Sequence, residues 1–154
     1  MPVMGLDVGD RSLGIALSDP SHTIARGVEA IRGATFSRDR CLNRVKELVA
    51  DEGVDIIVVG MPRNAAGEEG FQAQKVHTFI SELRRWVDTP VVTFDERFSS
   101  VSAERALREG RVSLAKRKEL RDKLAATIIL QTYLDHERFQ RHDTEVTETK
   151  RRQE

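Results

Sequence analysis

Two short apolar runs constrain the fold of this chain more than any other feature. The runs DIIVVGMP (residues 55–62) and VVTF (residues 91–94) are rich in β-branched residues and bounded by turn-forming residues, which is typical of parallel strands buried on both faces. Residues 71–87, between them, carry apolar side chains at helical spacing. A strand, a helix and a second buried strand make a β-α-β unit, so the sequence predicts an α/β fold.

The segment before this unit predicts an antiparallel extension of the same sheet. Residues 2–9 and 13–18 have the composition of strands joined by a turn, and residues 23–31 alternate loosely, as a third strand would. Residues 37–52 return to helical spacing and end at Gly53, a frequent helix terminator. We therefore expect a mixed five-stranded sheet, in which an antiparallel meander of three strands leads into β-α units, with helices on both faces.

The last third of the chain predicts helices followed by a charged tail. A helix is expected near residues 100–109, and a longer one near residues 119–138. After Phe139 the chain is almost without apolar residues, a composition that favours disorder. The expected organisation is one folded domain, residues 1–138, and a disordered tail, residues 139–154.

Composition excludes several classes of protein. A chain of 154 residues is long enough for one domain with a real core, and its formal net charge of zero means that any attraction to nucleic acid must come from local patches. The single cysteine excludes a disulfide framework and a cysteine-rich zinc site. Charged residues near the start argue against a signal peptide, and no apolar run approaches the ~20 residues of a membrane span. We expect a soluble, cytoplasmic protein.

Three acidic residues stand where a ligand could bind. Asp7 lies inside the first strand, and its same-face neighbours Gly5 and Gly9 lack side chains, which predicts open space above it. Glu96 directly follows the strand VVTF, and ligands gather beyond the carboxyl ends of parallel strands. Asp122 lies early in the last helix. Each position also has a structural alternative: backbone hydrogen bonding at Asp7, helix capping around residues 95–100, and a solvated first turn at Asp122.

Together, the three acids predict a metal site. Carboxylates that meet at one edge repel one another, and a cation relieves that repulsion. Oxygen ligands select a hard ion, Mg²⁺ or Mn²⁺. Acidic clusters that hold two such ions about 4 Å apart are typical of phosphoryl transfer. Asp7, Glu96 and Asp122 are therefore expected to be metal ligands and catalytic residues of an enzyme that acts on phosphate esters.

Four segments, GLDVGDRSLGIALSD, VVGMPRNAAGEEGFQAQKVHTFISELR, DERFSS and DKLAATIILQTYLD, occur in this order over about residues 3–135. In these segments the chain resembles the YqgF/RuvX family of pre-16S rRNA nucleases, also described as Holliday junction resolvases. The resemblance implies an RNase H-like fold and a bacterial cytoplasmic nuclease with a two-metal mechanism. The family's acidic positions fall on Asp7, Glu96 and Asp122. The implied reaction is phosphodiester hydrolysis in 5′-end processing of pre-16S rRNA during ribosome biogenesis, or alternatively cleavage of branched DNA in recombination and repair.

A basic segment precedes Asp122. Residues 108–123 contain seven basic and three acidic residues, and a solvated connection is the alternative to a phosphate-binding surface. Aromatic residues are few, and Phe71, Phe79 and Trp86 are expected on or near a core stripe, so recognition of backbone shape is favoured over base stacking. The residues expected to contact nucleic acid are Arg11, Arg63, Arg111, Lys116, Arg117, Lys118 and Arg121.

Two other functions compete with a nuclease. The pattern Asp7-Val8-Gly9 also matches the first phosphate loop of actin-like ATPases and sugar kinases, but the chain offers no second glycine-rich loop. A non-catalytic nucleic-acid-binding module that kept the fold is the other alternative, and metal binding distinguishes it from a nuclease. A junction resolvase cuts two strands symmetrically and usually works as a homodimer, whereas an RNA end-processing enzyme need not, and the sequence leaves both alternatives open.

Overall fold

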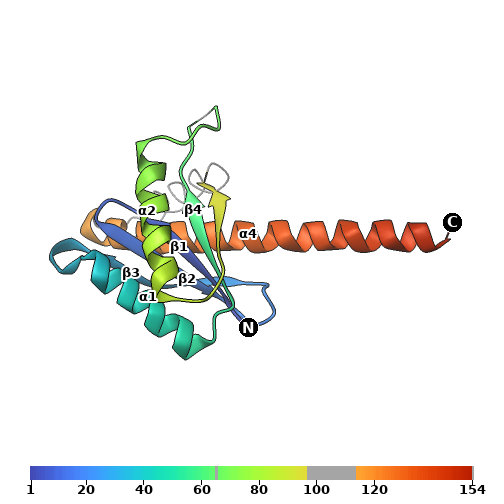
Figure 1. Cartoon of the computed structure of the whole chain (residues 1–154), viewed down its shortest axis with the longest axis horizontal. Helices are drawn as coiled ribbons and strands as arrows, with labels where there is room; N and C mark the ends of the chain where they lie inside the picture. The colour runs from blue at the N-terminus through green and yellow to red at the C-terminus, as the bar shows by residue number, and fades with distance from the viewer. Residues whose placement is uncertain (65, 97–113, 154) are drawn as a thin grey trace.

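The computed structural model describes residues 1–64, 66–96 and 114–153, and it confirms the predicted mixed sheet. The strand order is β3-β2-β1-β4-β5, with β1, β2 and β3 antiparallel and β1, β4 and β5 parallel. The elements, labelled as in Figure 1, are β1 (Val3–Val8), β2 (Ser12–Ser18), β3 (Ala25–Arg32), the 3₁₀ turn η1 (Gly33–Thr35), α1 (Arg38–Glu52), β4 (Ile56–Met61), α2 (Phe71–Trp86), β5 (Val91–Asp95) and α4 (Leu114–Gln153).

Helices α1 and α2 lie side by side on one face of the sheet (Figure 1). Side chains alternate along β1, so Met4 and Leu6 point to this face and are fully buried with Val45 of α1 and Leu83 of α2. This layer holds the larger of the two hydrophobic clusters in the described part of the chain. It supplies most of the apolar burial that stabilises the fold.

Local chemistry explains where α1 begins and ends. The Ser37 side chain accepts a hydrogen bond from the Arg40 N–H at 3.1 Å, which satisfies one of the free donors in the first turn. At the other end Gly53 adopts a left-handed conformation, with φ 66°, and its N–H donates to the Val49 carbonyl. The chain can therefore leave the helix at Gly53 and enter β4 within a few residues.

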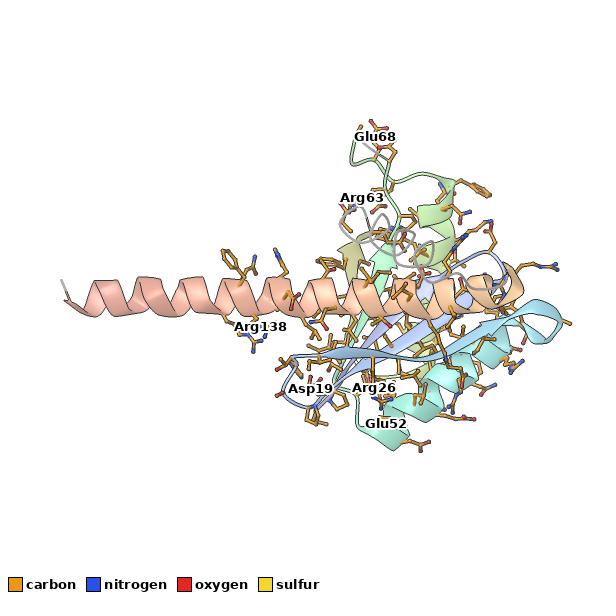
Figure 2. All side chains as sticks on the ribbon, turned by 180° about the vertical axis from the view of Figure 1, so that it is seen from behind. Asp19, Arg26, Glu52, Arg63, Glu68 and Arg138 are labelled. Carbon is orange, nitrogen blue, oxygen red and sulfur yellow. The ribbon has the colours of Figure 1, made fainter. Side chains whose placement is uncertain are left out.

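Helix α4 covers the opposite face of the sheet, as Figure 2 shows from behind. Ala126 and Leu130 of α4 are fully buried against Val3 of β1, Ala16 of β2 and Val58 of β4. The prediction of helices on both faces is therefore confirmed. The residues that β1 and β2 direct to this face are mostly small, so α4 lies close to the strands.

Helix α4 is longer than the sequence predicts. It begins at Leu114 rather than near 119, and it continues to Gln153, projecting beyond the sheet with Arg138 on the projecting part (Figures 1 and 2). On composition, the segment 139–154 was expected to be a disordered tail. The division into a folded domain, residues 1–138, and this tail stays a prediction. The helix expected near residues 100–109 lies outside the described residues. Despite its 40 residues α4 is strongly polar, and no helix in the described ranges is long and apolar enough to cross a membrane.

Candidate acidic active site

Asp7 and Glu96 meet at the carboxyl edge of the parallel strands. Asp7 lies near the end of β1 and Glu96 directly follows β5, with β4 between these strands. Gly60 of β4 makes their contact feasible, because a Cβ at this position would lie 2.7 Å from Glu96 Oε1. The Glu96 side chain therefore passes over β4 at Gly60 and shares a hydrogen bond with Asp7.

Asp122 comes to the same place from α4. Gly14 of β2 is the direct partner of Asp7 in the antiparallel ladder, and a Cβ at Gly14 would lie 2.0 Å from the Asp122 carbonyl oxygen. The helix backbone thus rests on a strand position that only glycine can occupy without a shift. The negative charge of Asp122 helps to raise the pKa of Asp7, which shows that the two carboxyl groups are close enough to interact. The structure brings together the three acids that the sequence singled out.

The surroundings of the cluster disfavour full ionisation of all three carboxyl groups. Burial is the main cause that raises the pKa of Asp7 to about 8, and the charge of Glu96, their shared hydrogen bond and the charge of Asp122 act in the same direction. Burial also raises the pKa of Glu96, although its hydrogen bond with Asp7 opposes this effect. Burial and mutual repulsion therefore favour one proton shared between Asp7 and Glu96. A buried cluster that must hold a proton at neutral pH is a cluster that a cation would stabilise.

Asp122 has two polar partners of its own. Arg32 Nη1 lies 3.2 Å from Asp122 Oδ2, and Ser12 hydrogen-bonds the same carboxylate. Burial raises the pKa of Asp122, while the charges of Arg32 and Arg121 and the Ser12 hydrogen bond lower it in part. Among the described residues, no group of three or more His, Cys, Asp or Glu side chains is arranged to hold a metal directly. The Asp122 carboxylate is engaged by Arg32 and Ser12 instead.

Sequence reasoning missed Arg32, which lies 90 positions from Asp122 in the chain. The available signal was its place at the end of the third strand. Arg32 pairs with Ser12 in the β2–β3 ladder, two residues from Gly14, so its side chain emerges on the face that α4 covers. Recognising the partner would have required knowing where α4 crosses β2.

The expected role of the glycines beside Asp7 was wrong. A Cβ at Gly5 would lie 2.7 Å from the Leu130 Cβ, so this glycine admits α4 rather than a ligand. Gly9 donates its N–H to the Ser12 carbonyl in a tight turn, and a Cβ there would lie 2.4 Å from Ser12 Oγ. The glycines that clear space around the acids are Gly14 and Gly60, on the neighbouring strands.

The predicted nucleic-acid contacts differ in their surroundings. Arg63, labelled in Figure 2, is engaged locally: its Nη2 lies 3.3 Å from Glu69 Oε1 and its Nε 3.9 Å from Asp95 Oδ2. Arg11 and Arg121 are exposed, and Arg121 is adjacent to Asp122. A shallow depression beside η1 is lined by Arg11, Phe36 and Ser37, among others.

The remaining predicted contacts lie in less fully described segments. Lys116, Arg117 and Lys118 belong to the first turns of α4, but their side chains lie outside the described part of the structure, as does Arg111 altogether. Their contribution stays a prediction.

Phe71 is an exception to the expected burial of aromatic residues. It is 73% exposed, with the Lys75 Nζ 5.0 Å from the centroid of its ring, whereas Phe79 is buried as expected. Phe71 is the first residue of α2 and precedes the first buried position of that helix, Ala73. The core stripe of α2 therefore begins one half-turn later than predicted.

Relatives of this chain cover nearly all of the described fold. Residues 1–136 match the family described as "RuvX: Holliday junction resolvase". A protein of Desulforamulus reducens is 47% identical over 135 residues, covering 88% of this chain and 97% of the relative. One of Caldanaerobacter subterraneus is 48% identical over 139 residues, covering 90% and 99% respectively. Both relatives carry the name "Putative pre-16S rRNA nuclease".

Two solved structures share the fold at low sequence identity. The RuvC of T. thermophilus in complex with a Holliday junction substrate is 18% identical, with a TM-score of 0.53 over 89% of this chain and 95% of RuvC. The fowlpox virus resolvase in complex with Holliday junction DNA is 13% identical, with a TM-score of 0.54 over 88% of this chain and 98% of the resolvase. These likenesses support the RNase H-like fold alone. With a family match over residues 1–136 and relatives near 47% identity, the chain belongs to the RuvX family.

Proposed function

We propose that this protein is a nuclease that hydrolyses phosphodiester bonds with the help of Mg²⁺ or Mn²⁺. One observation carries the proposal: Asp7, Glu96 and Asp122 converge at one sheet edge, and burial and mutual repulsion raise the pKa of Asp7 to about 8. Nuclease names among relatives that match 88–90% of the chain support the same reaction. An ATPase or sugar kinase is not favoured, because the family that matches residues 1–136 is described as a resolvase.

The chemistry of the three side chains suits a hard divalent cation, although Asp122 would have to turn from Arg32 and Ser12 to bind it. All three side chains offer carboxylate oxygens, which are the ligands that Mg²⁺ and Mn²⁺ prefer. Asp7 would bind from β1, Glu96 from the end of β5 and Asp122 from α4, so three elements packed on the core would fix the ligands. A divalent ion bound there would lower the pKa of an attacking water and stabilise the leaving oxygen.

Positive side chains beside the acids would hold the substrate. Arg121 is exposed next to Asp122, and Arg11 is exposed in the β1–β2 turn, three residues after Val8. In sequence, the basic segment 108–123 includes Arg121 and Asp122. Because the chain has no net charge, these local groups would supply the attraction to phosphates, and binding should weaken steeply with salt.

The favoured substrate is the 5′ region of pre-16S rRNA, because the relatives near 47% identity carry that name. Branched DNA is the second candidate, favoured by the family description and by the junction-bound structures that share the fold. A resolvase activity would call for a homodimer, and a nucleic-acid-binding module without cleavage is the remaining alternative.

Cleavage of two labelled substrates tests the proposal. A pre-16S leader RNA and a four-way DNA junction would each be incubated with Mn²⁺, with Mg²⁺ or with EDTA, using the wild type and Asp7→Asn. We expect metal-dependent cutting of the RNA that falls by more than about a hundredfold in the variant. Cutting of the junction alone would select the second substrate. No cutting by folded protein under any of these conditions would contradict the nuclease proposal.

A further inference from the structure

Arg32 occupies an unusual position beside the acidic cluster. It is the last residue of β3, and its Nη1 lies 3.2 Å from Asp122 Oδ2. The Asp122 side chain is 14% exposed, whereas the Arg32 side chain is 34% exposed. A guanidinium at the rim of the site therefore engages a carboxylate that lies mostly beneath it.

The partner of Arg32 is a carboxylate to which the proposed function assigns a metal. Ser12, the ladder partner of Arg32, hydrogen-bonds the same carboxylate. A metal ion that binds Asp122 must therefore compete with Arg32, because a cation and a guanidinium at one carboxylate also repel each other. Arg32 would lose its partner whenever the metal gains its ligand.

Once released from Asp122, the Arg32 side chain could bind a phosphate of the substrate. Its side chain is already one-third exposed, so the guanidinium can turn outward without being stranded in the core. The planar array of donors of an arginine guanidinium matches two phosphate oxygens at once. A phosphodiester that approaches the metal ligands would bring such oxygens to the rim at which Arg32 emerges.

We propose that Arg32 exchanges partners during the reaction, engaging Asp122 in the free protein and the substrate phosphate once a divalent cation has taken Asp122. The inference rests on the proposed function and adds to it a substrate-binding residue outside the three acids. Arg32 thus opposes metal binding in the absence of nucleic acid and favours binding of the nucleic acid itself. A residue with only a structural role would not act in opposite directions on the two ligands.

The chain offers a matched control in Arg44. Its Nε lies 3.1 Å from Glu29 Oε2, and both side chains of this pair are 33% exposed, much as Arg32 is. Glu29 belongs to the same strand as Arg32 but pairs with α1, on the other face of the sheet. Arg44 Nη1 also lies 3.0 Å from Glu47 Oε2, so Arg44→Ala removes an arginine of similar exposure with both of its ion pairs, away from the acids.

Metal affinity is the first measurement. Isothermal titration with Mn²⁺ alone would compare the wild type, Arg32→Ala, Arg32→Lys and Arg44→Ala. We expect Arg32→Ala to bind Mn²⁺ roughly threefold to tenfold more tightly, because the competing cation is gone. Arg44→Ala should match the wild type, and Arg32→Lys, which keeps the charge but loses the planar fork, should fall between them.

Nucleic-acid affinity is the second measurement. Fluorescence anisotropy with the leader RNA and with the junction, in Mn²⁺, would use the same four proteins with Asp7 intact, because Asp7 is a proposed metal ligand. Readings would be taken at short times at which gel electrophoresis shows the probe uncut. For whichever of the two nucleic acids the wild type cuts, Arg32→Ala should weaken binding by about tenfold at low salt. It should also reduce the slope of affinity against salt concentration by about one phosphate contact. Arg44→Ala should leave the affinity and the slope unchanged.

The outcomes separate the inference from the function on which it rests. Weaker Mn²⁺ binding by Arg32→Ala, or an unchanged affinity for nucleic acid, would overturn the exchange of partners while leaving the nuclease proposal intact. Should Arg32→Ala fail to fold by circular dichroism, Arg32→Lys decides the question, since an affinity equal to the wild type for both ligands would also overturn it. A wild type that binds neither Mn²⁺ nor nucleic acid would instead contradict the proposed function.

Discussion

The two faces of the sheet are built on different principles. Toward α1 and α2, the strands direct large side chains such as Met4, Leu6 and Ile15, all fully buried. Toward α4, the same two strands direct Gly5 and Gly14, where a Cβ would lie under 3 Å from the helix. The first face gains apolar burial, and the second gives up burial so that a helix can lie close to the strands. Closeness is what brings a helix carboxylate beside a strand carboxylate.

The difference extends to charge. On the α1 side, the Arg44–Glu29 pair is partly exposed and needs no further ligand. On the α4 side, burial raises the pKa values of Asp7, Glu96 and Asp122 together. Groups held in this way destabilise the folded state, as functional sites often do, and the larger cluster on the opposite face offsets the cost. The face toward α1 and α2 therefore supplies most of the stability, and the face toward α4 carries the acidic cluster.

Truncating one leucine on each face should have the largest effect and should show whether the two faces have different roles. Leu42 and Leu130 are both buried, on the α1 face and the α4 face respectively, so either change to alanine should lower the free energy of unfolding by about 2–5 kcal/mol. Only Leu130→Ala should also weaken Mn²⁺ binding, because Leu130 seats α4 on Gly5. Urea unfolding and calorimetry would measure the two quantities. An equal loss of metal affinity in Leu42→Ala would show that the faces are not separate.

Adding a methyl group to the α4 face should have the next largest effect. Gly14→Ala places a Cβ against a backbone oxygen of Asp122, which cannot rotate away, so we expect a cost of about 3 kcal/mol and a displaced α4. Ile15→Val on the same strand, facing the other way, should cost about 1 kcal/mol. Denaturant unfolding of the two variants gives the contrast. A Gly14→Ala protein as stable as Ile15→Val would mean that α4 does not rest on β2.

The pH dependence of stability should differ between wild type and Asp7→Asn. The folded state keeps a proton on Asp7 up to a pKa of about 8, whereas the unfolded chain loses it near 3.8. In that window the folded state binds more protons, so wild-type stability in EDTA should fall as pH rises, by at most about 1.4 kcal/mol per pH unit. Asp7→Asn should lack this contribution, and its advantage should level off above about pH 8. Parallel stability curves for the two proteins from pH 5 to 8 would contradict the buried, protonated Asp7.

Sequence reasoning succeeded where a local pattern carries the information. The β-branched run before Gly60 and the helical spacing of α1 predicted their elements because burial dictates periodicity. Asp7 and Glu96 could be placed together because parallel strands share an edge. Asp122 followed only from the combination with the other two acids.

The contacts that depend on how α4 crosses the sheet could not be derived in this way. The glycines next to Asp7 in sequence were expected to clear space for a ligand, yet Gly5 admits Leu130, and the space around the acids comes from Gly14 and Gly60 on other strands. The partnership of Arg32 with Asp122 likewise depends on a crossing point between elements 90 residues apart. A linear pattern records which face a residue occupies but not what lies opposite.

Thermal unfolding with and without Mn²⁺ tests most directly whether the α4 face is a metal site held together against its own charge. In EDTA at pH 8, Asp7→Asn should melt at a higher temperature than the wild type, because one of three mutually repelling carboxyl groups is gone. Saturating Mn²⁺ should raise the wild-type melting temperature by about 5 °C or more and leave Asp7→Asn nearly unchanged. A wild type that is the more stable protein in EDTA and shows no response to Mn²⁺ would contradict both the repulsion and the metal site.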